Sequence, residues 1–290
     1  MFKPRKCLEE QLIHFLNDDI GLGDSTTGAI IPANLVVTAN VIAKEPGTVA
    51  GIQEAAIFVQ SMDLKVKMNI ADGENVKNGQ VLMQITGDAQ TILTVERTLL
   101  NLLSRMCGIA TATHKLVKKL DSIKSNAKIA ATRKTAPGLS YFDKKAIIIG
   151  GGDSHRMHLD DMILIKDNHI ALIGNPVEAI KLAKKNGSFR KKLEVEITNV
   201  KDLLPVAKAG ADIIMLDNFT PKEANEAAEI LKNTKLPHEV LLEVSGGINE
   251  ETLIEYAQTK VDIISIGALT HSTKALDISL EITKNQSAPM

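Results

Sequence analysis

Basic side chains are concentrated in one stretch of the sequence, residues 132–169. The stretch contains Arg133, Lys134, His155, Arg156 and Lys166. The whole chain has a formal net charge of only -1 and a pI of about 6.7, so its positive charge is local. A nucleic-acid-binding surface usually spreads excess Lys and Arg over a domain and adds aromatic residues for base stacking, but aromatic residues make up 3% of this chain. The composition therefore favours a pocket for a small anion and no nucleic-acid partner.

Acidic residues that could oppose these basic groups occur farther along the chain. Glu194 and Glu196 are two apart on a predicted strand, so their side chains point to the same face. Asp217 ends the next predicted strand. Mg²⁺ prefers a few carboxylates together with water and phosphate oxygens. These residues predict a Mg²⁺ site, and equally they could pair with the basic residues of the pocket.

Two glycine-containing motifs follow the last two predicted strands. Ser245-Gly246-Gly247 and Ser265-Ile266-Gly267-Ala268 stand where many barrels bind phosphate through backbone N–H groups and a helix N-terminus. The pair favours a phosphate site. Gly150-Gly151-Gly152 could also bind an anion, but we interpret it as a tight turn.

Beyond residue 126, short apolar strands alternate with helical segments. The predicted strands are 128–132, 162–166, 193–197, 212–216, 239–244 and 262–266, and helical patterns at 176–185 and 221–231 begin with proline. Such repeats indicate a parallel sheet covered by helices. Six strands are fewer than the eight of a complete barrel. Because polar residues follow every strand, we expect the sheet to curl into an incomplete barrel rather than to stay open.

The first part of the chain has different patterns. Residues 8–17 predict an amphipathic helix, 35–87 alternate as β-strands with one buried face, and 91–120 carry a broad apolar helical stripe. Residues 72–82 resemble the turn of biotinyl and lipoyl carrier modules. A carrier needs a lysine at the tip of an exposed hairpin, whereas Lys67 lies within an alternating strand, so we interpret it as a solvent-facing strand residue.

The composition also limits where the protein works. Of 290 residues, 44% are hydrophobic and none is Trp, so one large or two ordinary domains with an aliphatic core are expected. Cys7 and Cys107 lie far apart and form no metal-binding pattern, which favours a reducing compartment. No segment has the length and apolarity of a membrane span. We therefore predict a soluble cytoplasmic protein without a membrane partner.

Several long motifs carry a resemblance to a known family. The main ones are Thr132-Arg133-Lys134-Thr135, Pro137-Gly138-Leu139, Lys144, Gly150-Gly151-Gly152, His155-Arg156 and Leu164-Ile165-Lys166-Asp167-Asn168-His169. Together they resemble the signature of the quinolinate phosphoribosyltransferases, the carboxylating nicotinate-nucleotide pyrophosphorylases. Glu96-Arg97-Thr98, Glu194-Val195-Glu196, Met215-Leu216-Asp217-Asn218 and the segments 243–248 and 265–272 extend the likeness over most of the chain.

The resemblance implies a fold and an activity. It implies an N-terminal α/β sandwich domain at 1–112, with 271–290 packing back on it, and an incomplete α/β barrel of about six parallel strands at 113–270. It also implies a homodimer and leaves a higher oligomer open. The family reaction joins quinolinate to phosphoribosyl pyrophosphate with Mg²⁺ and yields nicotinate mononucleotide, pyrophosphate and carbon dioxide for NAD biosynthesis.

The resemblance also implies roles by motif position. Substrate is expected at Thr132, Arg133, Lys134, His155, Arg156 and Lys166, with Arg97 supplied across the dimer interface. Lys134, Lys166, Glu196 and Asp217 are the expected catalytic residues, and the last two would also face the metal. Phosphate is expected at Ser245, Gly246, Gly247, Gly267 and Ala268.

Three other functions stay open on the sequence. They are a nicotinate or related ring-acid phosphoribosyltransferase, a barrel aldolase with Lys166 as Schiff base, and a carrier or interaction module in residues 35–87. The chain also departs from the family pattern at Ser140, where arginine is common, and at Lys145, where tyrosine is frequent. Both departures concern local packing or a secondary charge contact rather than the activity class.

Overall fold

The computed structural model describes residues 3–283. These residues divide into two compact units, one of residues 3–112 and 273–283 and one of residues 113–272. The division falls within the long helix α4 (Ala89–Ser122). Residues 284–290, part of the segment predicted to pack back on the first domain, lie outside the described residues.

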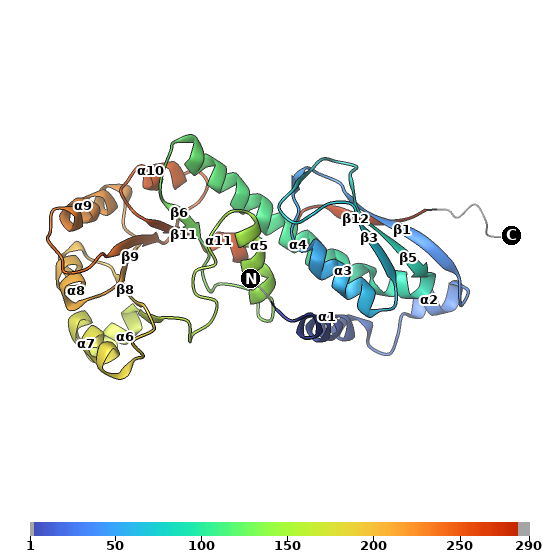
Figure 1. Ribbon diagram of the computed structural model, residues 1–290, viewed down its shortest axis with the longest axis horizontal. Coiled ribbons are helices and arrows are strands. Elements are labelled where there is room, and N and C mark those ends of the chain that lie inside the picture. The colour runs from blue at the N-terminus through green and yellow to red at the C-terminus, as the bar shows by residue number, and fades with distance from the viewer. Residues whose placement is uncertain (1–2, 284–290) are drawn as a thin grey trace. The chain divides into compact units, whose positions relative to one another are not determined.

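The first unit is built on an antiparallel sheet with strand order β12-β1-β5-β3 (Figure 1). Its strands are β1 (Val36–Ala43), β3 (Lys65–Met68), β5 (Val81–Asp88) and β12 (Ile278–Thr283), and β2 (Gly47–Thr48) pairs with β4 (Asn75–Val76). The helices are α1 (Arg5–Ile20), α2 (Ser25–Ile30), α3 (Ile52–Ser61) and the first part of α4. Every second residue of β1 is buried, the alternation expected of a strand with one face on the core.

The apolar stripe predicted for the long helix is confirmed. Its members Ile92, Val95, Leu99, Leu102, Leu103 and Met106 are all buried. Lys67 is an exposed residue of β3, as predicted. Met68, which the alternation placed on the buried face, is instead 50% exposed. The reason is that β3 is an edge strand and has a neighbour on one side only.

The second unit contains a parallel sheet of six strands in the order β6-β11-β10-β9-β8-β7. The strands are β6 (Lys128–Ala130), β7 (Ile163–Ile165), β8 (Leu193–Ile197), β9 (Ile213–Asp217), β10 (Leu241–Ser245) and β11 (Ile263–Ser265). Each overlaps a predicted strand. Parallel strands buried on both faces need nearly continuous apolar sequence, which made them recognisable.

Helices connect these strands and cover the outside of the sheet (Figure 1). They are α5 (Ser140–Ile149), α6 (Asp167–Ile173), α7 (Pro176–Asn186), η1 (Val200–Asp202), α8 (Leu203–Ala209), α9 (Pro221–Lys232), α10 (Leu253–Ala257) and α11 (Ala268–His271). Proline opens α7 and α9, as predicted. Asn175 caps α7, and Thr220 with Glu223 forms a capping box on α9.

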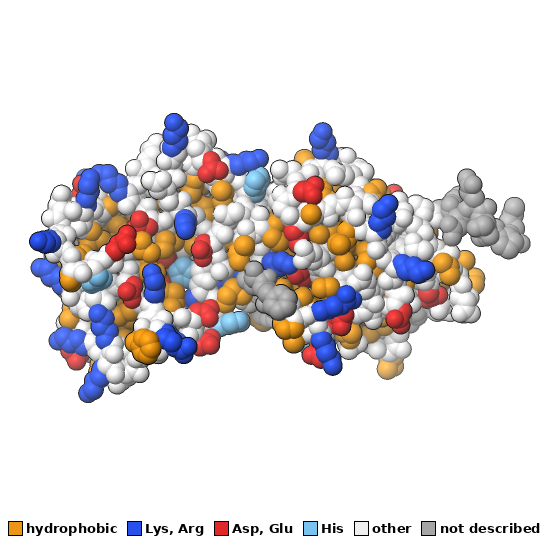
Figure 2. Space-filling model, in the orientation of Figure 1, with side chains coloured by type: hydrophobic (Ala, Val, Ile, Leu, Met, Phe, Trp, Pro, Cys, Tyr) orange, Lys and Arg blue, Asp and Glu red, His pale blue; other side chains and the backbone are white. Residues whose placement is uncertain are grey.

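The surface carries no single basic patch on the face drawn in Figure 2, where Lys and Arg side chains are interspersed with Asp and Glu. Within residues 3–283, none of the helices is both long enough and apolar enough to cross a bilayer.

Candidate active site

The carboxyl ends of all six parallel strands surround one cavity of about 390 Å³. Its lining is Ala131, Thr132, Arg133, Lys134, His155, Arg156, Leu164, Lys166, Glu196, Met215, Asp217, Glu243, Ser245 and Ser265. Residues from both edge strands, β6 and β7, reach the same cavity only if the sheet curls. The predicted incomplete barrel is thus confirmed, and its mouth is the expected position of a barrel active site.

The strand register arranges the lining side chains in levels. Glu243 pairs with Met215, which pairs with Glu196, so these three lie at one level of the barrel. Ser245 pairs with Asp217 and with Ser265, one level nearer the mouth. Residues two apart on a strand share a face, so both levels point inward. The deeper level of the lining therefore combines two carboxyl groups with the apolar Met215, and the level nearer the mouth is entirely polar.

His155 and Arg156 reach the mouth through the segment that follows α5. Gly151 has a φ of 94°, which favours glycine, and a Cβ on Gly152 would lie 2.8 Å from the Ile147 side chain. Asp153 then pairs with β6, because its N–H donates to the Ile129 carbonyl at 2.8 Å. The interpretation of the glycine run as a turn is confirmed, and its function is to return the chain to the sheet.

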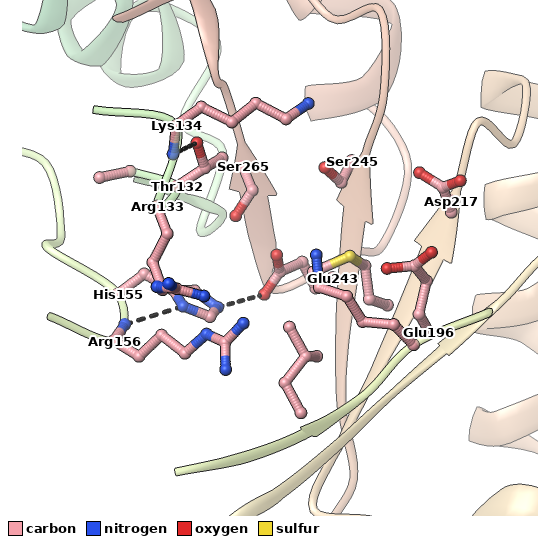
Figure 3. A pocket seen from close by; sticks show the side chains of 14 residues that line it. Thr132, Arg133, Lys134, His155, Arg156, Glu196, Asp217, Glu243, Ser245 and Ser265 are labelled. Atoms are coloured by element: carbon pink, nitrogen blue, oxygen red, sulfur yellow. Dashed lines mark hydrogen bonds and ion pairs between the residues drawn. The ribbon is translucent and has the colours of Figure 1, made fainter. Parts of the chain in front are cut away.

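The imidazole of His155 lies against two fully buried carboxyl groups. Its Nε2 is 3.0 Å from Oε2 of Glu243 and 3.4 Å from Oε2 of Glu194, as Figure 3 shows for Glu243. Burial lowers the pKa of His155, but the contacts with the carboxyl groups of Glu194 and Glu243 outweigh it and raise the pKa to about 10. Nδ1 accepts the backbone N–H of Arg156 at 2.8 Å. In this geometry a ring proton on Nε2 faces the two carboxyl groups, and the second proton, which the raised pKa favours, would require the contact at Nδ1 to open.

His155, Glu194 and Glu243 are, within residues 3–283, the one group of three ligand-type side chains close enough to share a cation. The hydrogen bonding of the ring argues against that use. A histidine binds a metal through an unprotonated nitrogen, and here Nδ1 is occupied by Arg156 while Nε2 carries the proton. The carboxyl groups of Glu194 and Glu243 instead contact the protonated Nε2 of the imidazole.

Arg133 and Arg156 lie near His155 on one side of the cavity (Figure 3), whereas the charge of Lys166 acts on Glu196. Arg156 is 9% exposed, and burial and the charge of Arg133 lower its pKa. Arg133, Lys134 and Lys166 are exposed at the mouth. The backbone of Lys134 is held by two hydroxyls, since its N–H donates to Thr132 Oγ1 at 3.1 Å and its carbonyl accepts from Thr270 Oγ1 at 2.8 Å.

Two carboxylates face these cations from the other side. Glu196 and Asp217 end β8 and β9, and Figure 3 shows both side chains directed into the same part of the cavity. Burial and the charge of Asp217 raise the pKa of Glu196. Asn218 orients Asp217 by donating from Nδ2 to Oδ2 at 2.8 Å. Like charges held together in this way favour a bound cation.

The predicted phosphate motifs end β10 and β11. Ser245 and Ser265 line the cavity, and the buried hydroxyl of Ser265 has no partner among the described residues. Gly246 and Gly247 have φ angles of 102° and 63°, while Gly267 precedes α11. These three glycines and Ala268 are not among the residues that line the cavity, although they directly follow strands whose serines do.

Arg97 is the one predicted site residue that belongs to the other unit, where it is exposed on α4. Sequence reasoning also missed residues that the cavity uses. Glu243 lines it, and Glu194 lies against His155 rather than beside Glu196. A charged residue inside an otherwise apolar strand, as in Leu241–Ser245, was the available signal.

Comparison with known proteins agrees with this geometry. Family models described as quinolinate phosphoribosyl transferase, N-terminal and C-terminal domain, match residues 24–107 and 109–281. A probable carboxylating nicotinate-nucleotide pyrophosphorylase of Methanocaldococcus jannaschii is 48% identical over 273 residues, covering 93% of this chain and 95% of the relative. The Mycobacterium leprae enzyme of that name is 39% identical over 92% of this chain and 94% of its own. The solved Francisella tularensis nicotinate-nucleotide pyrophosphorylase superposes with a TM-score of 0.88 at 35% identity, covering 97% of this chain and 98% of the other.

Proposed function

The chain belongs to the quinolinate phosphoribosyltransferase family, and from this premise we propose how its cavity performs the family's reaction. Quinolinate and phosphoribosyl pyrophosphate are the substrates. The products are nicotinate mononucleotide, pyrophosphate and carbon dioxide, and the step serves NAD biosynthesis. The observation that carries the proposal is the cavity itself, in which basic groups on one side face Glu196 and Asp217 on the other.

The basic side recognises the diacid. Quinolinate carries two carboxylates, and planar guanidinium groups match carboxylates with paired hydrogen bonds. Arg133 and Arg156 supply such groups, with His155 between them, and Lys134 and Lys166 add charge at the mouth. A ligand with one carboxylate would leave part of this charge unpaired, which favours quinolinate over nicotinate.

The chemistry follows from charge. The ring nitrogen of quinolinate forms a bond to C1 of the ribose while the bond from C1 to pyrophosphate breaks. Positive charge develops on the ribose, and Glu196 and Asp217 stabilise it, while Lys134 and Lys166 stabilise the departing pyrophosphate. The bond to the 2-carboxylate then breaks, carbon dioxide leaves, and the electron pair left on C2 takes a proton. The adjacent quaternary nitrogen stabilises that electron pair.

We assign the 5-phosphate to the ends of β10 and β11. The hydroxyls of Ser245 and Ser265, which line the cavity, are the proposed donors, together with backbone N–H groups of Gly246, Gly247, Gly267 and Ala268, which follow these two strands. The unpaired buried hydroxyl of Ser265 supports the assignment, because a buried donor without a partner is costly.

Mg²⁺ fits the pair Glu196 and Asp217. The raised pKa of Glu196 reflects burial and repulsion by Asp217, which a cation would relieve. When bound, Mg²⁺ neutralises charge on the pyrophosphate. Chelation should abolish turnover and added Mg²⁺ should restore it. Asp217→Asn should raise the Mg²⁺ concentration needed, and an unchanged requirement would remove Asp217 from the metal site.

We also propose a homodimer in which Arg97 of one subunit completes the site of the other. The exposure of Arg97 on α4 and its absence from the lining of its own chain's cavity support this. The unpaired thiols Cys7 and Cys107 support the cytoplasm as the place of action.

The deciding test of function is carbon dioxide release from carboxyl-labelled quinolinate. Release should require both phosphoribosyl pyrophosphate and Mg²⁺ and should match the amount of pyrophosphate formed. Turnover of nicotinate without turnover of quinolinate would contradict the proposal.

A further inference from the structure

Lys144 is a buried charged residue that the proposed reaction does not use. It lies on α5 and is 0% exposed. Its ammonium donates to the carbonyl of Ser154 at 2.6 Å and to the carbonyl of Arg156. Among the described residues its hydrogen-bond partners are carbonyl oxygens rather than carboxylates. Burying an ammonium without an ion-pair partner costs free energy, so the presence of Lys144 at this buried position requires an explanation.

The two carbonyls that Lys144 binds flank His155. The φ of His155 is 51°, in the left-handed region, which costs a side-chain-bearing residue roughly 1 kcal/mol. Lys144 therefore contacts the backbone on both sides of a strained residue. Without those hydrogen bonds, the segment would be free to relax toward an ordinary backbone conformation.

Other side chains hold the same segment from outside. Asp153 accepts the N–H of His155 at 2.7 Å. Asp161 accepts the N–H groups of Met157 at 2.6 Å and His158 at 3.0 Å. Side-chain groups thus replace the helix or sheet hydrogen bonds that this backbone lacks, and Lys144 is the buried member of the set.

The charges around Lys144 agree with a role in anion binding. Burial and the positive charge of Arg156 lower its pKa to about 8, with a smaller effect of Arg133, while Asp161 and Asp153 oppose the change. The ammonium thus lies behind the two guanidinium groups and adds to the positive potential at the mouth.

We propose that Lys144 is a positioning residue for the diacid site. Its two hydrogen bonds hold the left-handed turn at His155, and through that turn they fix the directions of the His155 and Arg156 side chains. The inference rests on the proposed function, because quinolinate is the ligand whose binding would report the loss of that geometry.

Lys144→Met tests the proposal, since it removes the donors and keeps an unbranched apolar stem. We expect the KM for quinolinate to rise about tenfold or more, equivalent to about 1.4 kcal/mol of binding. The KM for phosphoribosyl pyrophosphate should change less than about twofold, and the Tm should not fall, because a buried charge is removed. Lys144→Gln, which keeps an N–H donor, should recover part of the affinity. The exposed Lys181→Met is the matched control and should resemble the wild type.

A double-mutant cycle on quinolinate binding, measured by calorimetry, separates positioning from general stabilisation. If Lys144 acts through Arg156, adding Lys144→Met to Arg156→Ala should weaken binding much less than Lys144→Met does alone. Independent effects, or equal rises in both KM values with a lowered Tm, would overturn the proposal.

A second variant covers the case in which Lys144→Met fails to fold, and measurements on the wild type separate the role of Lys144 from the proposed function. If Lys144→Met does not fold, the exposed Asp153→Asn, which weakens the hold on the His155 N–H, should raise the KM for quinolinate in the same direction, and no rise would refute the positioning turn. A wild-type protein that neither binds nor converts quinolinate would refute the proposed function. Wild-type turnover with an unchanged KM in Lys144→Met would refute the role of Lys144 alone.

Discussion

At the scale of residues, the two guanidinium groups at the cavity mouth differ in environment. Arg133 is exposed, whereas Arg156 is almost fully buried and has its pKa lowered by burial and by Arg133. Two like charges held close together repel until an anion binds between them. The binding of a dianion therefore relieves a repulsion that is already present in the free protein.

Arg133→Ala should remove the more accessible of the two groups. We expect kcat/KM for quinolinate to fall by the equivalent of roughly 2–5 kcal/mol, the range for truncating one partner of a close charge pair. Steady-state kinetics on the variant gives the value. Arg190→Ala, an exposed arginine away from the cavity lining, is the control. An unchanged kcat/KM in Arg133→Ala would exclude a contact with substrate.

The charge of Lys144 also predicts how stability depends on pH. Its pKa is near 10.5 in the unfolded chain and about 8 in the folded protein. Between these values the unfolded state binds more protons, so stability should rise with pH by at most about 3 kcal/mol. Denaturant unfolding of the wild type and Lys144→Met from pH 7.5 to 10.5 checks this. The difference between the two should shift in favour of the wild type as pH rises, and a constant difference would show that Lys144 does not titrate in this range.

Sequence reasoning found the residues whose side chains line the cavity. It missed the buried residues that support them. Arg133, Arg156, Glu196 and Asp217 belong to recognisable motifs at strand ends. Lys144 was recognised only as part of the family motif, and no role was predicted for it. The carbonyls it binds lie ten and twelve residues away, on a turn whose shape the sequence does not specify. Glu194 was paired with Glu196 by alternation, which gives the face of a strand but not the depth in a barrel.

At the scale of elements, the ends of β9 and β10 form one unit. A Cβ on Gly246 would lie 2.2 Å from Oδ1 of Asn218, whose Nδ2 orients Asp217. The N–H of Asn218 also donates to the Ser245 carbonyl at 2.8 Å. The loop proposed to bind phosphate and Asp217, the carboxylate proposed to face the ribose, are therefore connected through Asn218.

Gly246→Ala should disturb both at once. We expect the KM for phosphoribosyl pyrophosphate to rise about tenfold or more, because a contact of 2.2 Å must be relieved and the φ of 102° is unfavourable for alanine. Gly174→Ala is the control, since Gly174 has a φ of 88° but open space around it. That variant should lose about 1 kcal/mol of stability with its KM unchanged. Equal KM values for phosphoribosyl pyrophosphate in the two variants would mean that the contact between position 246 and Asn218 does not affect substrate binding.

The six parallel strands were the most predictable elements, because burial on both faces leaves little choice of residue. The lengths of some strands were less predictable: β6, β7 and the interior strand β11 each contain three residues, although five were expected. The length of a strand depends on pairing with its neighbours, which sequence patterns do not contain. The pairing of Asp153 with β6 is of this kind, and it is what brings His155 to the site.

At the scale of the whole molecule, the proposed dimer makes a prediction about mixtures. Arg97→Ala and Arg133→Ala should each be nearly inactive alone. If Arg97 acts across the interface, subunits exchanged between the two variants form hybrids with one intact site, and part of the activity should return. Activity measured after mixing and re-equilibration gives the answer. Mixing two samples of the same variant is the control, and no recovery in the heterologous mixture would place Arg97 outside the partner's site.

The pairing of β12 with β1 has a consequence for how the chain is made. Thr38 to Ala43 pair with Thr283 to Ile278, so residues 44–277 must be synthesised before the sheet of the first unit can be completed. In the second unit, β6 likewise cannot pair with β11 until Ile263, the partner of Lys128, has been synthesised. On the ribosome, β1 therefore remains an unpaired edge during most of translation. Chaperone capture of nascent chains should consequently persist until β12 emerges, rather than ending when residues 3–112 have been translated.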